Sequence, residues 1–70
     1  MNGEYVVVFE PDDGGWTASV PDLPGCYSDA DSLEEAQFAI RRAIKLWIET
    51  AKQNGWPIPL PRVTVERVAV

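Results

Sequence analysis

The side chains with the greatest capacity for chemistry in this sequence are aspartates in two pairs. Asp12 and Asp13 precede a Gly-Gly pair, whereas Asp29 and Asp31 flank an alanine just before a serine. Carboxylate oxygens can hold Mg²⁺, but both pairs lie in stretches typical of turns, where aspartate hydrogen-bonds to nearby backbone. We therefore predict no metal site, and the sequence indicates no cofactor.

Nucleophilic catalysis lacks its usual groups. The sequence has no histidine, no Gly-x-Ser-x-Gly motif and a single cysteine, Cys26, with no basic neighbour in sequence to activate it. One cysteine forms no internal disulfide, and without histidine a zinc site lacks ligands. We expect Cys26 to be a packed small side chain, and we predict that the protein is not an enzyme.

Charge is distributed unevenly along the chain. The net charge is −5, but residues 1–40 carry nine acidic and no basic side chains, whereas residues 41–70 carry six basic and two acidic ones. The acidic half disfavours binding to nucleic acid and suits a basic partner. Alternatively, these acids are solvated turn and cap residues, or they pair with the basic half of the same chain.

The elements that must position these residues begin with two strands. The residues from Glu4 to Glu10 are mostly β-branched and aromatic, and apolar side chains on both faces are typical of a covered, central strand. The stretch from Pro11 to Gly15 has the composition of a hairpin turn. Alternating apolar residues from Trp16 to Val20 then predict a half-buried strand.

A proline-rich turn follows the second strand. Pro21 and Pro24 each lack an N–H, and Gly25 tolerates positive φ, so this stretch ends the strand and reverses the chain. The residues from Cys26 to Ser28 are expected to form a short third strand at an edge.

A helix is predicted from Leu33 to about Asn54. Ser32 and Glu35 have the spacing of a capping box, in which the serine hydroxyl accepts from the Glu35 N–H and the glutamate reaches back to the Ser32 N–H. Apolar residues then recur at helical spacing. Gly55 is a suitable stop because it can adopt the left-handed conformation.

The remainder of the chain completes the predicted topology. Residues 56–61 carry proline at every second position and must be extended, and Arg62 to Val70 is predicted as a last strand. The order β-β-β-α-β gives an α+β fold: a mixed four-stranded sheet with one helix on one face, in a single domain of residues 1–70. The last strand is expected to lie parallel to the first and beside it.

Seventy residues make a marginal core, so we expect at least a homodimer. Val6 and Val8 lie on the sheet face that the helix leaves uncovered, for which the candidate covers are residues 56–61, a second copy or another protein. Val68 and Val70 end an unprotected edge, and these four valines are the predicted interface residues. No apolar run is long enough to span a bilayer and no leader opens the chain, so we expect a cytoplasmic protein without membrane contact.

Several motifs of this chain are typical of one family: Tyr5, Asp13-Gly14-Gly15-Trp16-Thr17-Ala18, Val20-Pro21-Asp22-Leu23-Pro24-Gly25-Cys26, Asp31-Ser32-Leu33-Glu34-Glu35-Ala36 and Gly55-Trp56-Pro57-Ile58-Pro59. With these motifs the chain resembles the HicB antitoxins of bacterial and archaeal toxin–antitoxin pairs. The resemblance implies a partial ribonuclease-H-like fold. It also implies binding to a small basic HicA-type toxin that cleaves mRNA, and covering of its active site.

Under this resemblance, the residues expected to face the toxin are acidic turn residues: Asp12, Asp13, Asp22, Asp29 and Asp31. Many members continue into a DNA-binding domain, for which this chain leaves no residues after its last strand, so we expect no direct DNA or RNA binding. The alternative is a stand-alone oligomeric HicB-like scaffold with no toxin partner. A neighbouring gene for a small basic protein with one histidine would favour the antitoxin.

Overall fold

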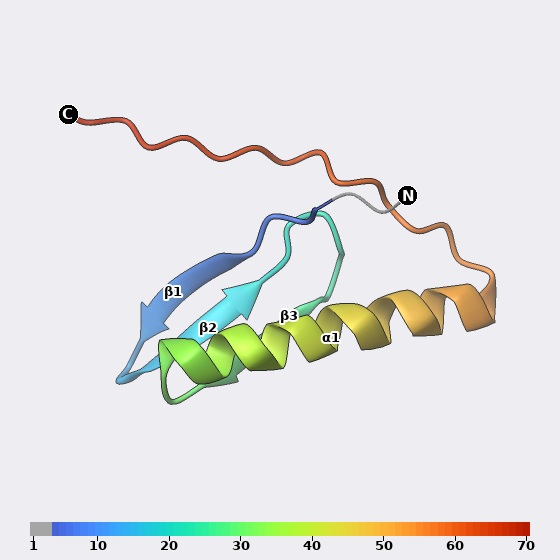
Figure 1. Cartoon of the computed structure of the whole chain (residues 1–70), viewed down its shortest axis with the longest axis horizontal. Coiled ribbons are helices and arrows are strands. Elements are labelled where there is room, and N and C mark those ends of the chain that lie inside the picture. Colours follow the sequence, from blue (N-terminus) through green and yellow to red (C-terminus); the bar gives the residue numbers. More distant parts are fainter. Residues whose placement is uncertain (1–3) are drawn as a thin grey trace.

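The computed structural model describes residues 4–70 and has an α+β architecture. Three strands, β1 (Val8–Asp12), β2 (Gly15–Ser19) and β3 (Tyr27–Ala30), precede one long helix, α1 (Leu33–Asn54). The strands form an antiparallel sheet in the order β1-β2-β3, and α1 packs on one face of it (Figure 1). The order β-β-β-α is therefore as predicted.

A two-residue turn joins β1 to β2. Asp12 pairs with Gly15, and the two residues between them, Asp13 and Gly14, have φ of 48° and 86°. Positive φ at both central positions is characteristic of a type I′ turn, whose twist matches that of a hairpin. The turn is thus shorter than the predicted Pro11–Gly15 stretch, and Pro11 lies within β1.

The position predicted for the first strand is wrong. β2 is central and β1 is an edge strand, and β1 spans Val8–Asp12 rather than Glu4 to Glu10. Tyr5, Val7 and Phe9 pack against the core from this segment. The opposite face of the segment is not buried to the same extent, since Val8 on that face is 37% exposed. Apolar residues on both faces were therefore a poor indicator of a central strand.

The turn after β2 is closed by backbone hydrogen bonds. The Val20 N–H donates to the Cys26 carbonyl at 3.0 Å, the Leu23 N–H to Val20, and the Cys26 N–H to Leu23. Gly25 has a φ of 78°, which glycine adopts without strain. Val20 and Cys26, predicted as strand ends, therefore belong to this turn, and β3 starts one residue later than expected.

Both ends of α1 are capped as predicted. The Ser32 hydroxyl accepts from the Glu35 N–H at 3.1 Å; the Glu35 carboxylate, however, accepts from the Ser32 hydroxyl at 3.1 Å rather than from the Ser32 N–H. At the other end Gly55 has a φ of 69°, and the Trp56 N–H donates to the Ala51 carbonyl at 2.9 Å. This bond, together with the left-handed conformation of Gly55, is characteristic of a Schellman motif.

The core lies between the sheet, the turn after β2 and the first half of α1. Leu23 and Ile40 are its largest fully buried side chains, and the other members are Ala18, Val20, Cys26 and Ala36. Pro21 and Pro24 are exposed around Leu23. The indole Nε1–H of Trp47 donates to the Pro24 carbonyl at 2.9 Å, so the helix also holds the turn in place.

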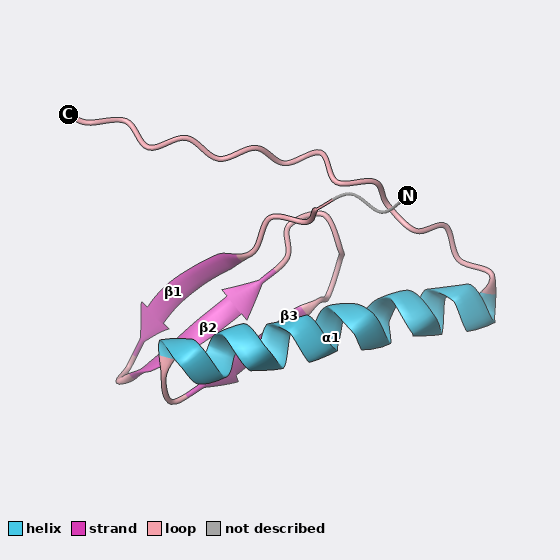
Figure 2. Cartoon of the chain, viewed as in Figure 1, coloured by secondary structure: helices cyan, strands magenta, loops and turns pink. Residues whose placement is uncertain are grey.

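The predicted last strand is not formed. Within residues 4–70, no strand follows α1. From Trp56 the chain runs extended back to the turn after β2, where Asp22 binds Arg62 and Val63, and then diverges from β1 (Figure 2). The sheet is accordingly three-stranded and antiparallel rather than four-stranded and mixed. The alternate prolines keep the chain extended, but the pairing with β1 that a fourth strand requires is not made.

Candidate partner-binding site

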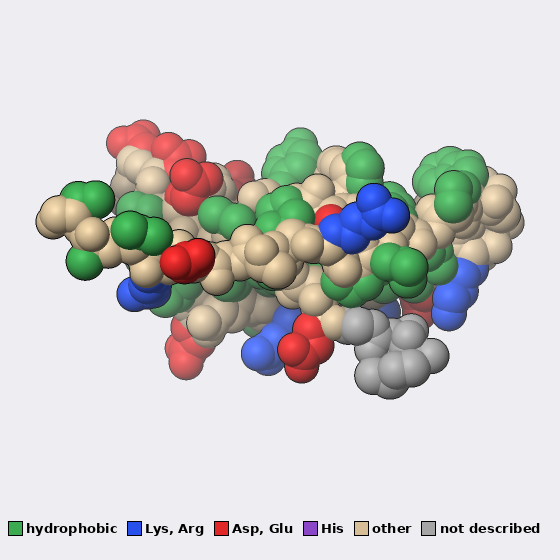
Figure 3. Space-filling view, turned by 90° about the horizontal axis from the view of Figure 1, so that it is seen from above, with side chains coloured by type: hydrophobic (Ala, Val, Ile, Leu, Met, Phe, Trp, Pro, Cys, Tyr) green, Lys and Arg blue, Asp and Glu red, His purple; other side chains and the backbone are tan. Residues whose placement is uncertain are grey.

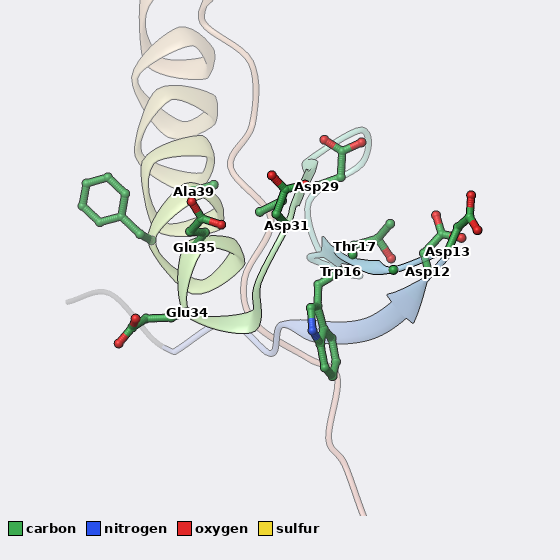
Figure 4. Close-up of a pocket in the computed structure, with 13 residues that line it drawn as sticks. Asp12, Asp13, Trp16, Thr17, Asp29, Asp31, Glu34, Glu35 and Ala39 are labelled. Atoms are coloured by element: carbon green, nitrogen blue, oxygen red, sulfur yellow. The ribbon is translucent and has the colours of Figure 1, made fainter.

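An open acidic groove of about 920 Å³ lies at the end of the molecule where the β1–β2 turn, the end of β3 and the start of α1 meet. Its acidic lining consists of Asp12, Asp13, Asp29, Asp31, Glu34 and Glu35. Figure 4 shows the helix glutamates on one side, the hairpin aspartates on the other, and Asp29 and Asp31 between them. Figure 3 shows acidic side chains gathered at this end.

The hairpin side of the groove depends on Gly15. A Cβ atom built on Gly15 would lie 2.7 Å from the Ala30 carbonyl oxygen, a distance that real Cβ atoms do not reach. Glycine therefore lets the start of β2 come close to the end of β3. The pairing of the strands places Asp12, at the end of β1, and Asp13, in the turn, at the same end of the sheet as Asp29, and all three are exposed.

The helix side of the groove follows from the capping box. Because Ser32 starts the helix, Glu34 and Glu35 fall in its first turn, where the helix dipole stabilises negative charge. Glu35 uses one carboxylate oxygen to bind the Ser32 hydroxyl. Asp31 directly precedes the cap and is exposed. Local folding rules alone therefore place acidic side chains on this side.

Aromatic rings lie among the carboxylates. Trp16 is half-buried and Phe38 is 63% exposed, and both line the groove. The guanidinium carbon of Arg42 lies 5.8 Å from the centre of the Phe38 ring, a cation–π distance. Of the described residues that line the groove, none is lysine or arginine. The surface is thus suited to cationic side chains, which carboxylates attract and aromatic rings stack against.

The structure places four of the five predicted aspartates in this groove and puts Asp22 elsewhere. The Asp22 carboxylate accepts from the backbone N–H groups of Arg62 and Val63, at 3.0 and 3.1 Å. It therefore anchors the C-terminal segment to the turn after β2 instead of projecting from a turn as expected. The groove also contains residues that were not predicted: Glu34, Glu35, Trp16 and Phe38. The spacing of the helix cap could have placed the two glutamates there.

The fold also shows how the acidic side chains and the Cys26 thiol are placed for metal binding and for nucleophilic chemistry. Within residues 4–70, no three acidic or cysteine side chains are arranged to hold one metal ion. Cys26 is only 5% exposed and belongs to the core, and desolvation by this burial raises the pKa of its thiol. A protonated thiol is a poor nucleophile at neutral pH, so Cys26 serves packing, as predicted.

The predicted interface valines are in different environments. Val6 is half-buried, Val8 is 37% exposed, and Val68 and Val70 are largely exposed on the C-terminal segment. A separate prediction concerned the membrane. In the described part of the chain, no helix is both long and apolar enough to cross a membrane.

The fold and the groove define a class: a small α+β protein that exposes an acidic surface edged by aromatic rings. Within that class the chain belongs to the HicB-like antitoxins of bacterial toxin–antitoxin systems, because the model of that family matches residues 5–69. The predicted family resemblance is thereby confirmed. Membership implies a toxin partner and suggests a role that is not enzymatic.

Relatives of similar length occur in distant organisms. A UPF0150 protein of the archaeon Thermoplasma acidophilum is 34% identical over 93% of this chain and 91% of its own length. A UPF0150 protein of the cyanobacterium Synechocystis is 37% identical over 94% of this chain and 85% of its own. An uncharacterized 14.9 kDa protein of Haemophilus phage HP1 is 36% identical over 79% of this chain, but only 41% of its own length is matched.

Proposed function

We propose that this protein neutralises a small basic HicA-type toxin that cleaves mRNA, by binding the toxin's RNA-binding surface and covering its active site. Family membership supports the antitoxin role. The observation that carries the proposal is the acidic groove, which collects six carboxylates beside two aromatic rings.

The chemistry of the groove matches that of a surface built to bind RNA. Proteins hold RNA phosphates with lysine and arginine, and carboxylates attract the same cationic groups. An arginine of the toxin can pair with a carboxylate and stack on an aromatic ring at once; Trp16 lies among the acids of the groove, and Phe38 offers the ring face that Arg42 of this chain does not cover. The protein would thus compete with RNA for the basic surface.

Charges and rings contribute differently to such a complex. Exposed charges mainly raise the association rate and select the partner, whereas apolar contact slows dissociation. Trp16 and Phe38 would supply the apolar contact. Because the toxin's substrate is mRNA, the proposal places the complex in the cytoplasm and requires no catalytic group or cofactor of this chain.

The test measures association with any small basic HicA-type protein that is encoded beside this gene. We expect Asp13→Asn, Asp29→Asn and Asp31→Asn together to slow association about tenfold at low salt, because steering by charge is lost. The wild-type rate should also fall as salt rises to physiological strength, where the Debye length is about 8 Å. A parallel assay follows toxin-catalysed RNA cleavage, which the wild-type protein should stop.

The matched control is Glu4→Gln, Glu49→Gln and Glu66→Gln, which removes the same number of charges away from the groove. Its association rate should stay within about twofold of wild type if the groove, rather than net charge, steers the toxin. Equal loss in both triple variants would contradict the groove as the binding surface. A toxin that neither binds nor is inhibited would favour the alternative, an oligomeric scaffold without a toxin partner.

A further inference from the structure

The C-terminal segment leaves backbone groups without partners. Along residues 4–70, the last hydrogen bonds to it are those from Arg62 and Val63 to the Asp22 carboxylate. Residues 64–70 are exposed and extended, and they carry Val65 and Val68, which are 70% and 72% exposed, and Val70. An extended, valine-rich segment of this kind is a strand in need of a sheet edge.

The sheet has a matching open edge on β1. In a two-residue hairpin the residues flanking the turn form a hydrogen-bonded pair, so Asp12, Glu10 and Val8 bond to β2. The intervening residues Phe9 and Pro11 then direct their backbone groups outward. Pro11, which has no N–H, falls at an outward position, as its chemistry requires. Phe9 offers an N–H and a carbonyl, and Pro11 a carbonyl, to an incoming strand.

Charge also favours pairing between this edge and this segment. Glu10 and Asp12 lie on β1, whereas residues 64–70 carry Arg67, which can pair with either acid, and Glu66 as their one acid. Opposite charges on neighbouring strands stabilise pairing by a few tenths of a kcal/mol or more. The acidic edge therefore suits this segment better than it suits a second β1 strand, whose acids would repel it.

The chain's own anchors hold the segment off its own β1. The Tyr5 hydroxyl donates to the Pro59 carbonyl, and Asp22 binds Arg62 and Val63, so the segment leaves the body beside the turn after β2. From there it diverges from β1 of the same chain (Figure 1). Residues 64–70 therefore extend from their own molecule with backbone groups that are free to pair with another strand.

We propose that two copies exchange these segments, each adding residues 64–70 as a fourth strand to the open β1 edge of the other. Seven extended residues reach about 23 Å, enough to cover the five residues of β1, which span about 17 Å. A two-fold axis makes both contacts identical. The exchange pairs the β1 edge and residues 64–70 of each copy at the same time. A toxin strand added to β1 would instead leave residues 64–70 unpaired. The marginal core of a 70-residue chain gains stability by it.

The test is the mass of the protein in solution. Light scattering at tens of micromolar should give twice the mass of one chain, and a chain ending at Val63, which keeps both anchors, should be a monomer with unchanged helical circular dichroism. The double substitution Val65→Pro/Glu66→Pro, which removes an N–H on either side of the strand, should also give a monomer. Its matched control, Val65→Thr/Glu66→Gln, should remain a dimer.

Hydrogen exchange separates this arrangement from its competitors. In the dimer, the amides of residues 64–70 should exchange at least about tenfold more slowly than in the proline variant. A wild-type monomer with slowly exchanging amides in residues 64–70 would overturn the proposal in favour of pairing within one chain. A dimer that persists after removal of residues 64–70 would overturn it in favour of packing through Val6 and Val8. These outcomes are read without any toxin, so they are distinct from failure of the antitoxin role.

Discussion

The two ends of the sheet use the same residue type in opposite ways. At the groove end, Asp12, Asp13, Asp29 and Asp31 are exposed and line one surface. At the other end, Asp22 is half-buried and holds two backbone N–H groups of the C-terminal segment. A carboxylate in a turn is therefore either an exposed charge on a shared surface or an anchor for the chain, according to which segment passes beside it.

The bonds that build the two ends also differ in range. The groove end is made by local contacts, chiefly the bond between Ser32 and Glu35, three residues apart. The other end is tied by contacts between distant segments: Trp47 to Pro24, Tyr5 to Pro59 and Asp22 to Arg62. Both ends therefore contribute to stability, the first through short-range contacts and the second through contacts between distant segments, and three substitutions compare them.

The largest effect on stability is expected at Gly15, the tightest contact of the groove end. Gly15→Ala places a Cβ against the Ala30 carbonyl, so the strands must shift, which costs about 1–3 kcal/mol. The control is Gly14→Asn: nothing lies within 4 Å of a Cβ there, so this variant carries only the backbone strain of a side chain at a φ of 86°, which asparagine tolerates better than most residues. Denaturant unfolding measures both. Equal stability of the two variants would show that the close approach is not required.

A smaller effect is expected at Asp22. Asp22→Ala removes a charged acceptor from two N–H groups and should lower the free energy of unfolding by about 1–2 kcal/mol. Amide exchange at Arg62 and Val63 should speed up in the same variant. The matched substitution Asp29→Ala, on the exposed strand face, should change stability by less than about 0.5 kcal/mol. If Asp22→Ala and Asp29→Ala lower the free energy of unfolding by the same amount, Asp22 is not an anchor that distinguishes its end of the sheet from the groove end.

The smallest effect is expected at the helix cap. Ser32→Ala removes the acceptor for the Glu35 N–H and should cost about 1 kcal/mol, or about 4–8 °C in melting temperature for a domain of this size. Ser32→Asp keeps an acceptor and should remain near wild type. If the melting temperature of Ser32→Ala stays within a degree of wild type, the Ser32 cap does not stabilise the helix.

Elements governed by short-range chemistry were predicted well. The helix bounds, the Ser32 cap and the Gly55 stop are confirmed, because each depends on residues within one or two turns of one another. Strand bounds were off by one to four residues, since the two-residue turn moved Pro11 and Asp12 into β1. The acidic groove was largely anticipated as a set of aspartates, but not as one surface shared with Glu34, Glu35 and Phe38.

By itself, the sequence determined the type and order of the elements and the acidic character of one end, because caps, turns and side-chain alternation act through neighbouring residues. Only the tertiary structure decided which strand is central, where the Asp22 carboxylate is used and where the C-terminal segment leaves the body. The last two features depend on contacts between residues about 40 or more positions apart, from Asp22 to Arg62 and from Tyr5 to Pro59. No local pattern encodes such a pairing, because it forms only where the packed core brings distant backbone groups within hydrogen-bond reach.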